Sequence, residues 1–364
     1  MRFVRAIANL MAVLLPIHIS WAQQPLPEGV VEALNVAVSF TAEAESERVQ
    51  WTRTEERLGA KYIRLHFVSI EDQSTNEYKV LLRNRNNRIV VELPRQTFAA
   101  ESDFWTQSID GDFVRIEVVA ATKPTGLTFV LSDIAYQRNM GAPFSIVLPD
   151  EREPVRVYRD TPILSERIHS VAKLIFIEGG MSASCTGFLI DDDRMLTNEH
   201  CINRADTCKT AIAIFDYEVG ENGSINTGQQ FRCAQFIAAD RTLDVSLIRL
   251  TGKPGLVYGH LTLNGRAIVL DEQAYMIQHP AGEPKQISRK GCSITTVATA
   301  GNGPETDFGH KCDTLGGSSG SPMLGADYTV IGLHHFGFDG TDVRWRAENR
   351  AVRMPQIISW VQSK

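Results

Sequence analysis

Gly316-Gly317-Ser318-Ser319-Gly320-Ser321-Pro322 is a run of small residues that can hold one serine hydroxyl in the open beside two backbone N–H groups. Glycine adopts the backbone dihedrals that such a turn needs and lets a substrate carbonyl approach closely. By itself, a Gly/Ser run is more often a linker. Two other segments favour a catalytic loop. Thr197-Asn198-Glu199-His200-Cys201 places a histidine after an apolar run, and Leu243-Asp244-Val245-Ser246-Leu247-Ile248 places an aspartate in an apolar strand.

The three segments supply the parts of a nucleophilic triad in the chain order His, Asp, Ser. A serine hydroxyl is a poor nucleophile unless a neighbouring base takes its proton. We therefore expect Ser319 to attack a peptide carbonyl, and His200 to accept its proton and then deliver it to the leaving amine. Asp244 would hold the imidazole tautomer, and the N–H groups of Gly317 and Ser319 would form the oxyanion hole.

These segments also resemble a known family. Cys185-Thr186-Gly187-Phe188-Leu189-Ile190, followed by Leu196 to Cys201, is similar to the start of a trypsin-like serine protease domain. Asp313 to Pro322 and Val330-Ile331-Gly332-Leu333-His334 resemble the bacterial glutamyl-endopeptidase (V8-like) branch. The resemblance covers roughly residues 168 to 362. It implies a chymotrypsin-like fold of two six-stranded β-barrels, with the active site in the cleft between them.

The resemblance also separates the three serines of the loop. Ser319 is the serine of the family's Gly-x-Ser-Gly pattern, so Ser318 and Ser321 are expected to be scaffolding. Trypsin has an aspartate just before its catalytic serine, which pairs with a newly freed N-terminus on activation. Here that position is Ser318, so an activation switch of that kind is not expected.

The residues that would select the substrate allow two interpretations. Asp313 lies where trypsin-like enzymes hold the carboxylate that selects Arg or Lys. Aspartate followed by threonine also occurs in acidic-specific relatives, in which Thr314 and His334 would bind a glutamate carboxylate. A histidine beside an acidic side chain makes physical sense. Cleavage after acidic residues is slightly favoured, and the direction of the Asp313 side chain decides between the two.

The six cysteines all follow residue 184. In an exported protein this number suggests three disulfides, although the sequence alone leaves their connectivity open. The resemblance implies that Cys185 pairs with Cys201. Cys292 and Cys312 flank the loop before the serine motif and are expected to pair, which leaves Cys208 for Cys233. A metal site is not expected, because no CxxC or Cys/His ligand spacing occurs. No cofactor is expected either.

The first 22 residues are typical of a signal peptide. Arg2 and Arg5 precede an apolar stretch, and Ser20-Trp21-Ala22 fits a cleavage site, so the mature chain is expected to start at Gln23. The stretch is too short for a transmembrane helix, and no later apolar run is long enough to span a bilayer. The protein is therefore expected to be secreted or periplasmic, without stable membrane insertion.

With 364 residues the chain is expected to have two domains. Short apolar or alternating runs between turn signals predict an N-terminal β-sandwich, jelly-roll-like, over residues 23–140. These runs are Val36–Phe40, Tyr62–Val68, Tyr78–Leu82, Ile89–Leu93, Phe113–Val119 and Leu127–Leu131. Proline density with charge predicts an extended linker over 141–167, in which Arg159 and Arg167 are candidate maturation sites.

The strand pattern resumes in residues 168–364, the expected protease domain. Expected strands are Val171–Ile177, Thr186–Ile190, Ala211–Phe215, Val245–Leu250, Ala274–Ile277 and Thr329–Leu333. A C-terminal helix is expected around Ile357, Ile358 and Val361, which share one face. The fold class is therefore all-β.

The favoured function is an exported serine endopeptidase that forms an acyl-enzyme on protein or peptide substrates. The alternative is a silent protease fold whose N-terminal sandwich binds carbohydrate or a surface protein, with Trp51 and Trp105 as a platform, although tryptophans are more often core residues. An esterase with the same triad is a third hypothesis. The net charge of −6 gives no footprint for nucleic acid, and a monomer is the default.

Overall fold

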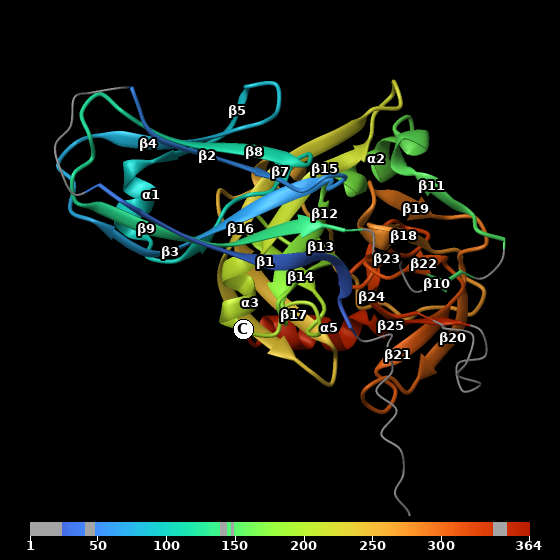
Figure 1. Cartoon of the computed structure of the whole chain (residues 1–364). Helices are drawn as coiled ribbons and strands as arrows, with labels where there is room; N and C mark the ends of the chain where they lie inside the picture. Colours follow the sequence, from blue (N-terminus) through green and yellow to red (C-terminus); the bar gives the residue numbers. More distant parts are fainter. Residues whose placement is uncertain (1–23, 41–47, 139–143, 147–148, 338–347) are drawn as a thin grey trace, which may run out of the picture.

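The computed structural model describes residues 24–40, 48–138, 144–146, 149–337 and 348–364. β-Strands are the main secondary structure, and they form two facing N-terminal sheets and two further β units (Figure 1). The expected signal peptide lies outside the described residues. No helix among the described residues is both long and apolar enough to cross a membrane.

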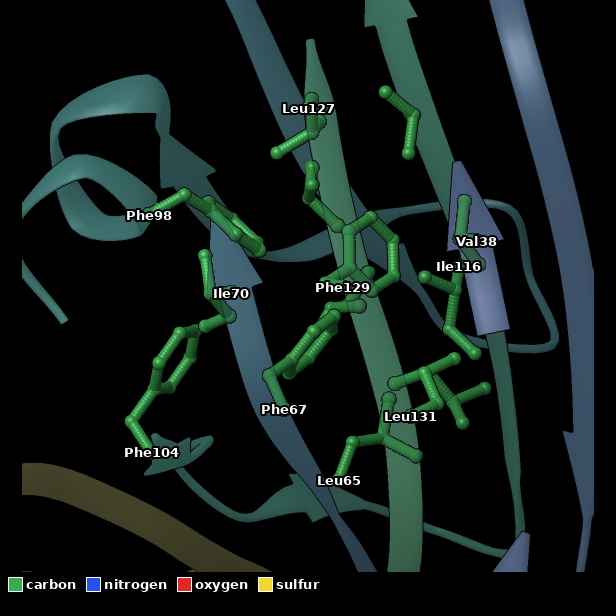
Figure 2. Close-up of a cluster of buried hydrophobic side chains, with 14 of the residues drawn as sticks. Val38, Leu65, Phe67, Ile70, Phe98, Phe104, Ile116, Leu127, Phe129 and Leu131 are labelled. Atoms are coloured by element: carbon green, nitrogen blue, oxygen red, sulfur yellow. The ribbon is translucent and has the colours of Figure 1, made fainter. Parts of the chain in front are cut away.

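The N-terminal part contains two facing sheets, as the alternating runs predict. Its elements are β1 (Leu26–Ser39), β2 (Val49–Glu56), β3 (Tyr62–Asp72), β4 (Tyr78–Arg83), β5 (Ile89–Pro94), α1 (Arg95–Ala100), β6 (Phe104–Trp105), β7 (Ile109–Asp110), β8 (Phe113–Ala120) and β9 (Leu127–Gln137). One sheet has the order β2-β8-β4-β5, and β1, β9, β3 and β6 lie next to one another in the other. Inward-pointing residues of both sheets form one buried cluster (Figure 2).

Aromatic rings dominate this cluster. Phe67 packs against Phe98, Phe104 and Phe129, with ring centroids 5.2–5.5 Å apart. The two tryptophans of the module belong to its packing: Trp51 packs edge-on against Phe129, and the buried Trp105 stacks on His66. The exposed tryptophan platform of the binding-protein hypothesis is therefore not formed.

The first barrel is closed. It contains β12 (Val171–Glu178), β13 (Met181–Leu189), β14 (Arg194–Thr197), α3 (Ala205–Thr210), β15 (Ile212–Val219), β16 (Ile225–Asp240) and β17 (Val245–Leu250). The strand order is β12-β15-β16-β17-β14-β13, and a ladder between β12 and β13 completes the circle. The first four of the six expected protease strands correspond to β12, β13, β15 and β17 of this unit, and the expected triad residues at 200 and 244 lie in its turns.

The second β unit is a half-barrel sheet. It contains β11 (Arg152–Pro154), β18 (Tyr275–Gln278), β19 (Gln286–Ser288), β20 (Ile294–Thr299), β21 (Asp307–His310), β23 (Pro322–Leu324), β24 (Val330–Phe336) and β25 (Asn349–Arg353), in the order β11-β19-β18-β23-β24-β25-β21-β20. Within the described residues no ladder joins its two edge strands. This unit thus has more strands than the six expected and is less closed. The expected double-barrel architecture is otherwise confirmed.

Residues 152–169 correct the expectation of an extended linker. β11 pairs with β19, η2 (Val155–Tyr158) follows it, and α2 (Pro162–His169) is a helix with Pro162 at its start. Leu164 and Ile168 of α2 are buried in the cluster between the two β units. The proline-rich pattern hid this helix, because proline is also favoured in the first turn of a helix.

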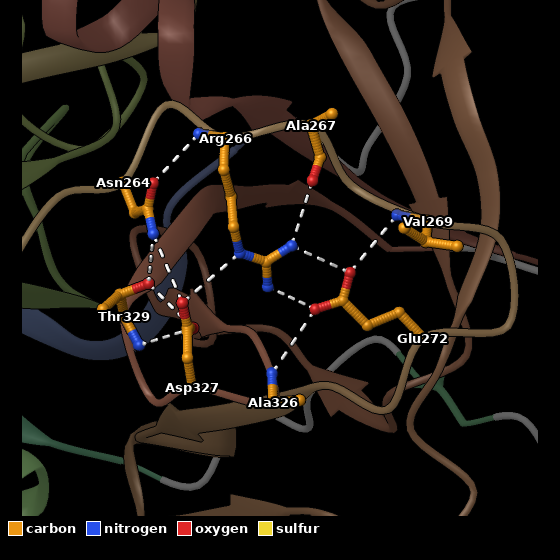
Figure 3. Close-up of polar contacts among 8 residues, drawn as sticks. All are labelled: Asn264, Arg266, Ala267, Val269, Glu272, Ala326, Asp327 and Thr329. Atoms are coloured by element: carbon orange, nitrogen blue, oxygen red, sulfur yellow. Dashed lines mark hydrogen bonds and ion pairs between the residues drawn. The ribbon is translucent and has the colours of Figure 1, made fainter.

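The two β units share a hydrophobic core. It includes Phe188 and Leu247 of the first barrel, Leu333 of the second unit, and Ile357 of α5 (Met354–Gln362). The expected C-terminal helix is thus present and packs at this boundary. The connection after α4 (Gly255–Tyr258) is fixed by Arg266, which pairs with Glu272 and Asp327 (Figure 3). This network fastens the connecting segment to the turn between β23 and β24.

The N-terminal module shares a sheet with the first barrel. β1 pairs with β9 on one side and with β13 on the other, with Leu26 opposite Ser184. The sequence analysis places the start of this strand at Val36, ten residues too late. Pro27 and Gly29 break the alternating pattern and accompany a shift of register. Because a Cβ on Gly29 would overlap the backbone oxygen of Tyr136, only glycine fits there.

Candidate active site

The loop from Gly316 to Pro322 is held by its own serines. Ser318 is buried, and its Oγ donates to Gln278 Oε1 (2.5 Å). Ser321 is buried too, and its Oγ donates to the carbonyl of Ser318 (2.6 Å). Ser319 is half-buried, and its hydroxyl has no hydrogen bond within the described residues. The two serines expected to be scaffolding are thus hydrogen bonded, whereas the Ser319 hydroxyl is not hydrogen bonded to any described residue.

Thr186 of β13 fixes the backbone around Ser319. Its N–H donates to the carbonyl of Ser319 (2.8 Å), and its Oγ1 donates to the carbonyl of Gly317 (2.9 Å). Gly317 and Gly320 have φ values of 92° and 86°, which favour glycine. In addition, a Cβ on Gly320 would overlap the backbone oxygen of Thr186. The glycines of the loop therefore allow its close approach to β13.

The N–H groups of Gly317 and Ser319 make no hydrogen bond to other described residues. The loop is supported from behind, because the N–H of Ala281 donates to the carbonyl of Gly316 (2.6 Å). Ala281 lies in η3 (Pro280–Gly282), and a Cβ on Gly317 would lie 2.8 Å from the carbonyl oxygen of His279. Two unengaged N–H groups beside an unengaged serine hydroxyl are what an oxyanion hole requires.

His200 and Asp244 are brought together. Nδ1 of His200 lies 2.7 Å from Oδ2 of Asp244, and the backbone N–H of His200 donates to Oδ1 (3.0 Å). Asn198 donates from Nδ2 to the carbonyl of Asp244 (2.8 Å), and Asp244 has a φ of 43°, which aspartate tolerates better than most residues. Both carboxylate oxygens therefore face His200, which fixes the ring and directs Nε2 away from Asp244.

A disulfide brings this pair to the serine loop. Cys185, next to Thr186, is bonded to Cys201, next to His200. The Nε2 atom of His200 is buried and has no hydrogen bond to any described residue. The hydroxyl of Ser319 is likewise not hydrogen bonded to His200. Catalytic hydrogen bonds are often loose before substrate binds.

His335 also belongs to the cluster around Asp244. The sequence motifs did not identify this residue. Its Nδ1 lies 3.2 Å from Oδ2 of Asp244, and its Nε2 lies 2.7 Å from Oδ2 of Asp307. Both ring nitrogens face carboxylates, which requires the imidazolium form. Although burial disfavours that form, Asp307 and Asp244 raise the pKa of His335 to about 9. The only sequence signal was its position next to His334.

The same contacts affect Asp244. Burial alone would raise the pKa of this carboxyl, but His200 and His335 outweigh burial and hold its pKa well below the usual range. Asp244 is therefore ionised at neutral pH. The His200–Asp244–His335–Asp307 chain alternates imidazole and carboxylate through the boundary between the two β units.

The carboxylate of Asp313 is hydrogen bonded within the chain. Its side chain is buried, and Oδ2 accepts the backbone N–H of Glu151 (2.9 Å), while its carbonyl accepts from Gln278 Nε2 and Ser288 Oγ. The carboxylate is thus engaged by the segment that precedes β11.

Thr314 and His334 have a different setting. Thr314 is buried in β22 (Thr314–Leu315), and its Oγ1 has no hydrogen bond to a described residue. The N–H of Cys312 donates to Nδ1 of His310, so the proton of that ring is on Nε2, which donates to Nδ1 of His334 (3.1 Å). Burial and neighbouring histidines lower the pKa of His334 well below its ordinary value, so it is neutral with its proton on Nε2.

The remaining disulfides are Cys208–Cys233 and Cys292–Cys312, so all three expected pairs are present. His200 is within reach of both sulfurs of the Cys185–Cys201 bond, a cluster of metal-ligand type. Because both sulfurs are in the disulfide, they are not thiolate ligands.

The family model of the trypsin-like peptidase domain matches residues 185–333. Over these residues the chain is similar to trypsin-like peptidase domains. The match runs from Cys185 beside the candidate histidine loop to Leu333 on β24, so it includes every candidate triad residue.

Similar proteins were also found among curated proteins and solved structures. "Secreted RxLR effector protein 73" of Plasmopara viticola is 35% identical over 182 residues, which is 46% of this chain and 45% of that protein. The inactive form of Rv3671c from M. tuberculosis H37Rv is 15% identical, with a TM-score of 0.44, and covers 58% of this chain and 95% of its own. A Glu endopeptidase structure is 18% identical, with a TM-score of 0.44, and covers 60% and 100%.

Proposed function

We propose that the peptidase domain is an active serine endopeptidase with Ser319 as nucleophile, His200 as general base and acid, and Asp244 as the residue that orients His200. The observation that carries this proposal is the 2.7 Å contact between His200 Nδ1 and Asp244, with Nε2 of His200 not hydrogen bonded to any described residue. The N–H groups of Gly317 and Ser319 would stabilise the oxyanion.

The charge of the cluster supports the base role of His200. Asp244 and Asp307 carry two negative charges and His335 carries one positive charge, so one negative charge remains. When His200 takes the proton of Ser319, its imidazolium neutralises that charge in a buried place. The adjacent Asp244 carboxylate then stabilises the imidazolium that develops in the transition state of acyl transfer.

A reactive-serine probe tests the proposal. Incubation with a fluorophosphonate, whose leaving group is fluoride, is expected to label Ser319, and a short peptide amide of aminocoumarin is expected to be hydrolysed. Ser319→Ala should abolish both, and His200→Ala should lower kcat by a factor of about 10³ or more. Ser224→Ala, an exposed serine on the surface, is the matched control and should keep both. An unlabelled wild-type chain would instead favour the silent binding-protein alternative.

We further propose that the site prefers an acidic residue on the acyl side of the scissile bond. Asp313 is engaged by the chain itself, which speaks against a role in binding Arg or Lys. The unpaired Oγ1 of Thr314 and the Nε2–H of His334 are donors that suit a carboxylate. The backbone carbonyl of Arg350 also acts on the His334 ring, so a substrate carboxylate would have to replace or share that contact.

A series of aminocoumarin amides that differ only in the acyl residue tests this preference. Glu is expected to give the highest kcat/KM, and Thr314→Val is expected to lower the value for Glu by about tenfold, because the lost hydrogen bond goes to a charged group. The kcat/KM for Gln or Ala should change less. If the Arg or Lys amide has the highest kcat/KM, Asp313 would be the residue that selects the substrate.

We propose that the protein is exported, with its N-terminal module retained as part of the folded enzyme. Three disulfides favour an oxidising compartment, since thiols are kept reduced in the cytosol. Retention is supported by the shared sheet of β1 and β13. Mass spectrometry of the protein recovered from culture medium and periplasm tests both export and retention of the N-terminal module. A recovered chain that starts near residue 168 would contradict retention.

A further inference from the structure

The N-terminal end of β1 lies against the candidate catalytic loop. Leu26 is 4% exposed, pairs with Ser184, and has its Cδ2 3.3 Å from the place that a Cβ on Gly317 would take. Two residues after Ser184, the N–H of Thr186 binds the carbonyl of Ser319. β1 therefore begins beside both the proposed nucleophile and the proposed oxyanion hole.

The chemistry of acyl transfer fixes which side of Ser319 receives the leaving group. His200 must give its proton to the leaving amine, so this amine lies on the His200 side of Ser319. The Cys185–Cys201 disulfide joins that side to β13, and a ring nitrogen of His200 lies within 4.8 Å of both sulfur atoms. β13 is therefore joined directly to the leaving-group side of the site.

The edge of β13 at this place is already occupied. β12 pairs with one edge of β13 along its length. On the other edge, β14 pairs with Phe188 and Leu189 only, and β1 pairs with residues 181–184. A free strand edge at this position would bind an extended peptide through main-chain hydrogen bonds. In this chain, β1 makes those pairings instead.

The polarity of β1 also matches that of a leaving peptide. β1 is antiparallel to β13, so its N-terminal end at Leu26 is near Thr186 and Ser319, and the strand then runs away from them. The leaving half of a cleaved peptide has the same polarity, because its new amino terminus is at the nucleophile. β1 thus occupies the edge in the direction that a substrate would take.

We propose that the N-terminal end of β1 occupies the subsites for the leaving-group half of a peptide substrate, with Leu26 as a specificity-determining side chain. This inference rests on the proposed roles of Ser319 and His200. With β1 in place, the site accepts acyl substrates with small leaving groups, such as esters and arylamides. It disfavours peptides that continue for several residues beyond the scissile bond. Cleavage within a protein then requires this end of β1 to leave β13.

Two substrates with the same acyl half test the proposal on the full chain. One carries aminocoumarin as its leaving group, and the other carries a four-residue peptide with a quencher. The acyl residue is whichever gives the fastest aminocoumarin amide. We expect kcat/KM for the extended substrate to be lower by about tenfold or more, which corresponds to a difference of 1.36 kcal/mol in activation free energy.

Leu26→Ala supplies the second arm. It is expected to raise kcat/KM for the extended substrate severalfold and to leave the short substrate nearly unchanged. Val38→Ala is the matched control, because Val38 lies on the same strand, is 5% exposed and packs in the sandwich core. It should not change the ratio between the two substrates.

The outcomes separate the two proposals. Equal kcat/KM values for short and extended substrates in the wild-type chain would overturn the role of β1, as would a folded Leu26→Ala variant with an unchanged ratio. If that variant does not fold in a thermal-melting control, the wild-type ratio still decides. Failure of both substrates, together with no fluorophosphonate labelling of Ser319, contradicts the proposed function and not the placement of β1.

Discussion

His334 and His335 are adjacent in the chain and have opposite chemical environments, because successive residues of a strand point to opposite faces. His334 faces His310, and burial keeps it neutral. His335 faces Asp244 and Asp307, which keep it protonated in spite of its burial. One strand of the second β unit thus supplies a neutral donor to the candidate specificity pocket and a cation to the candidate triad.

The charge on His335 predicts how stability depends on pH. Its pKa is about 9 in the folded chain and near 6.5 in an unfolded one. The folded state therefore binds its proton more tightly, and the stabilisation is present in full below about pH 6.5. It is lost as pH rises through 9. We expect the free energy of unfolding to fall by up to about 3 kcal/mol between these pH values, measured by urea denaturation.

His335→Gln should remove most of this alkaline slope and should lower the stability at pH 7. His169→Gln is the control, because His169 is exposed and pairs only with the surface residue Asp216, so the slope should persist. A wild-type protein whose unfolding free energy stays constant from pH 6.5 to 9 would show that His335 is not a buried imidazolium.

At the scale of elements, one buried ion pair fastens β1 to β12. Lys173 Nζ lies 2.9 Å from Glu28 Oε2 and donates to the carbonyl of Gly282 in η3 (2.7 Å), and both side chains are almost completely buried. Glu28 Oε1 also accepts from Tyr62 of β3. The N-terminal module, the first barrel and the turn behind the serine loop therefore meet at this pair.

A double-mutant cycle measures this junction. Lys173→Met leaves the Glu28 carboxylate buried without its cation and is expected to cost about 3–5 kcal/mol of stability. Because the Glu28→Gln/Lys173→Met pair has no uncompensated charge, it should be less destabilised than Lys173→Met alone. The exposed pair Lys61–Glu283 is the control, and its cycle should give no more than about 1 kcal/mol. Additive effects of Glu28→Gln and Lys173→Met would contradict a coupled pair.

The elements also show what a single sequence can predict. Alternating apolar runs predicted the cores of β3, β4, β8, β12 and β17, because these strands bury one or both faces. β16 was missed, since much of it is polar and exposed and gives no alternating signal. The His200–Asp244 contact was predicted from motif order. His335 could not be assigned, because only the register of β24 decides which of two adjacent histidines faces Asp244.

At the scale of the whole molecule, the division into an N-terminal module and a peptidase domain does not correspond to a break in structure. β1 belongs to both, and contacts such as Arg232–Glu101 and Arg64 to the carbonyl of Thr210 cross the boundary. The sequence suggested two independent units, since cysteines occur only after residue 184 and a proline-rich segment separates the halves. Pairing between residues about 150 positions apart leaves no local signal.

A continuous sheet predicts that the whole chain unfolds as one cooperative unit. Calorimetry of the full chain with intact disulfides should give one transition whose calorimetric and van't Hoff enthalpies agree. Phe129→Ala, deep in the sandwich core and far along the chain from the triad, should cost about 3–5 kcal/mol and move that entire transition to lower temperature. In the same variant, the temperature at which the fluorophosphonate no longer labels Ser319 should fall by the same amount. Two separate transitions, with only one shifted by Phe129→Ala, would mean that β1 connects two domains without coupling their stability.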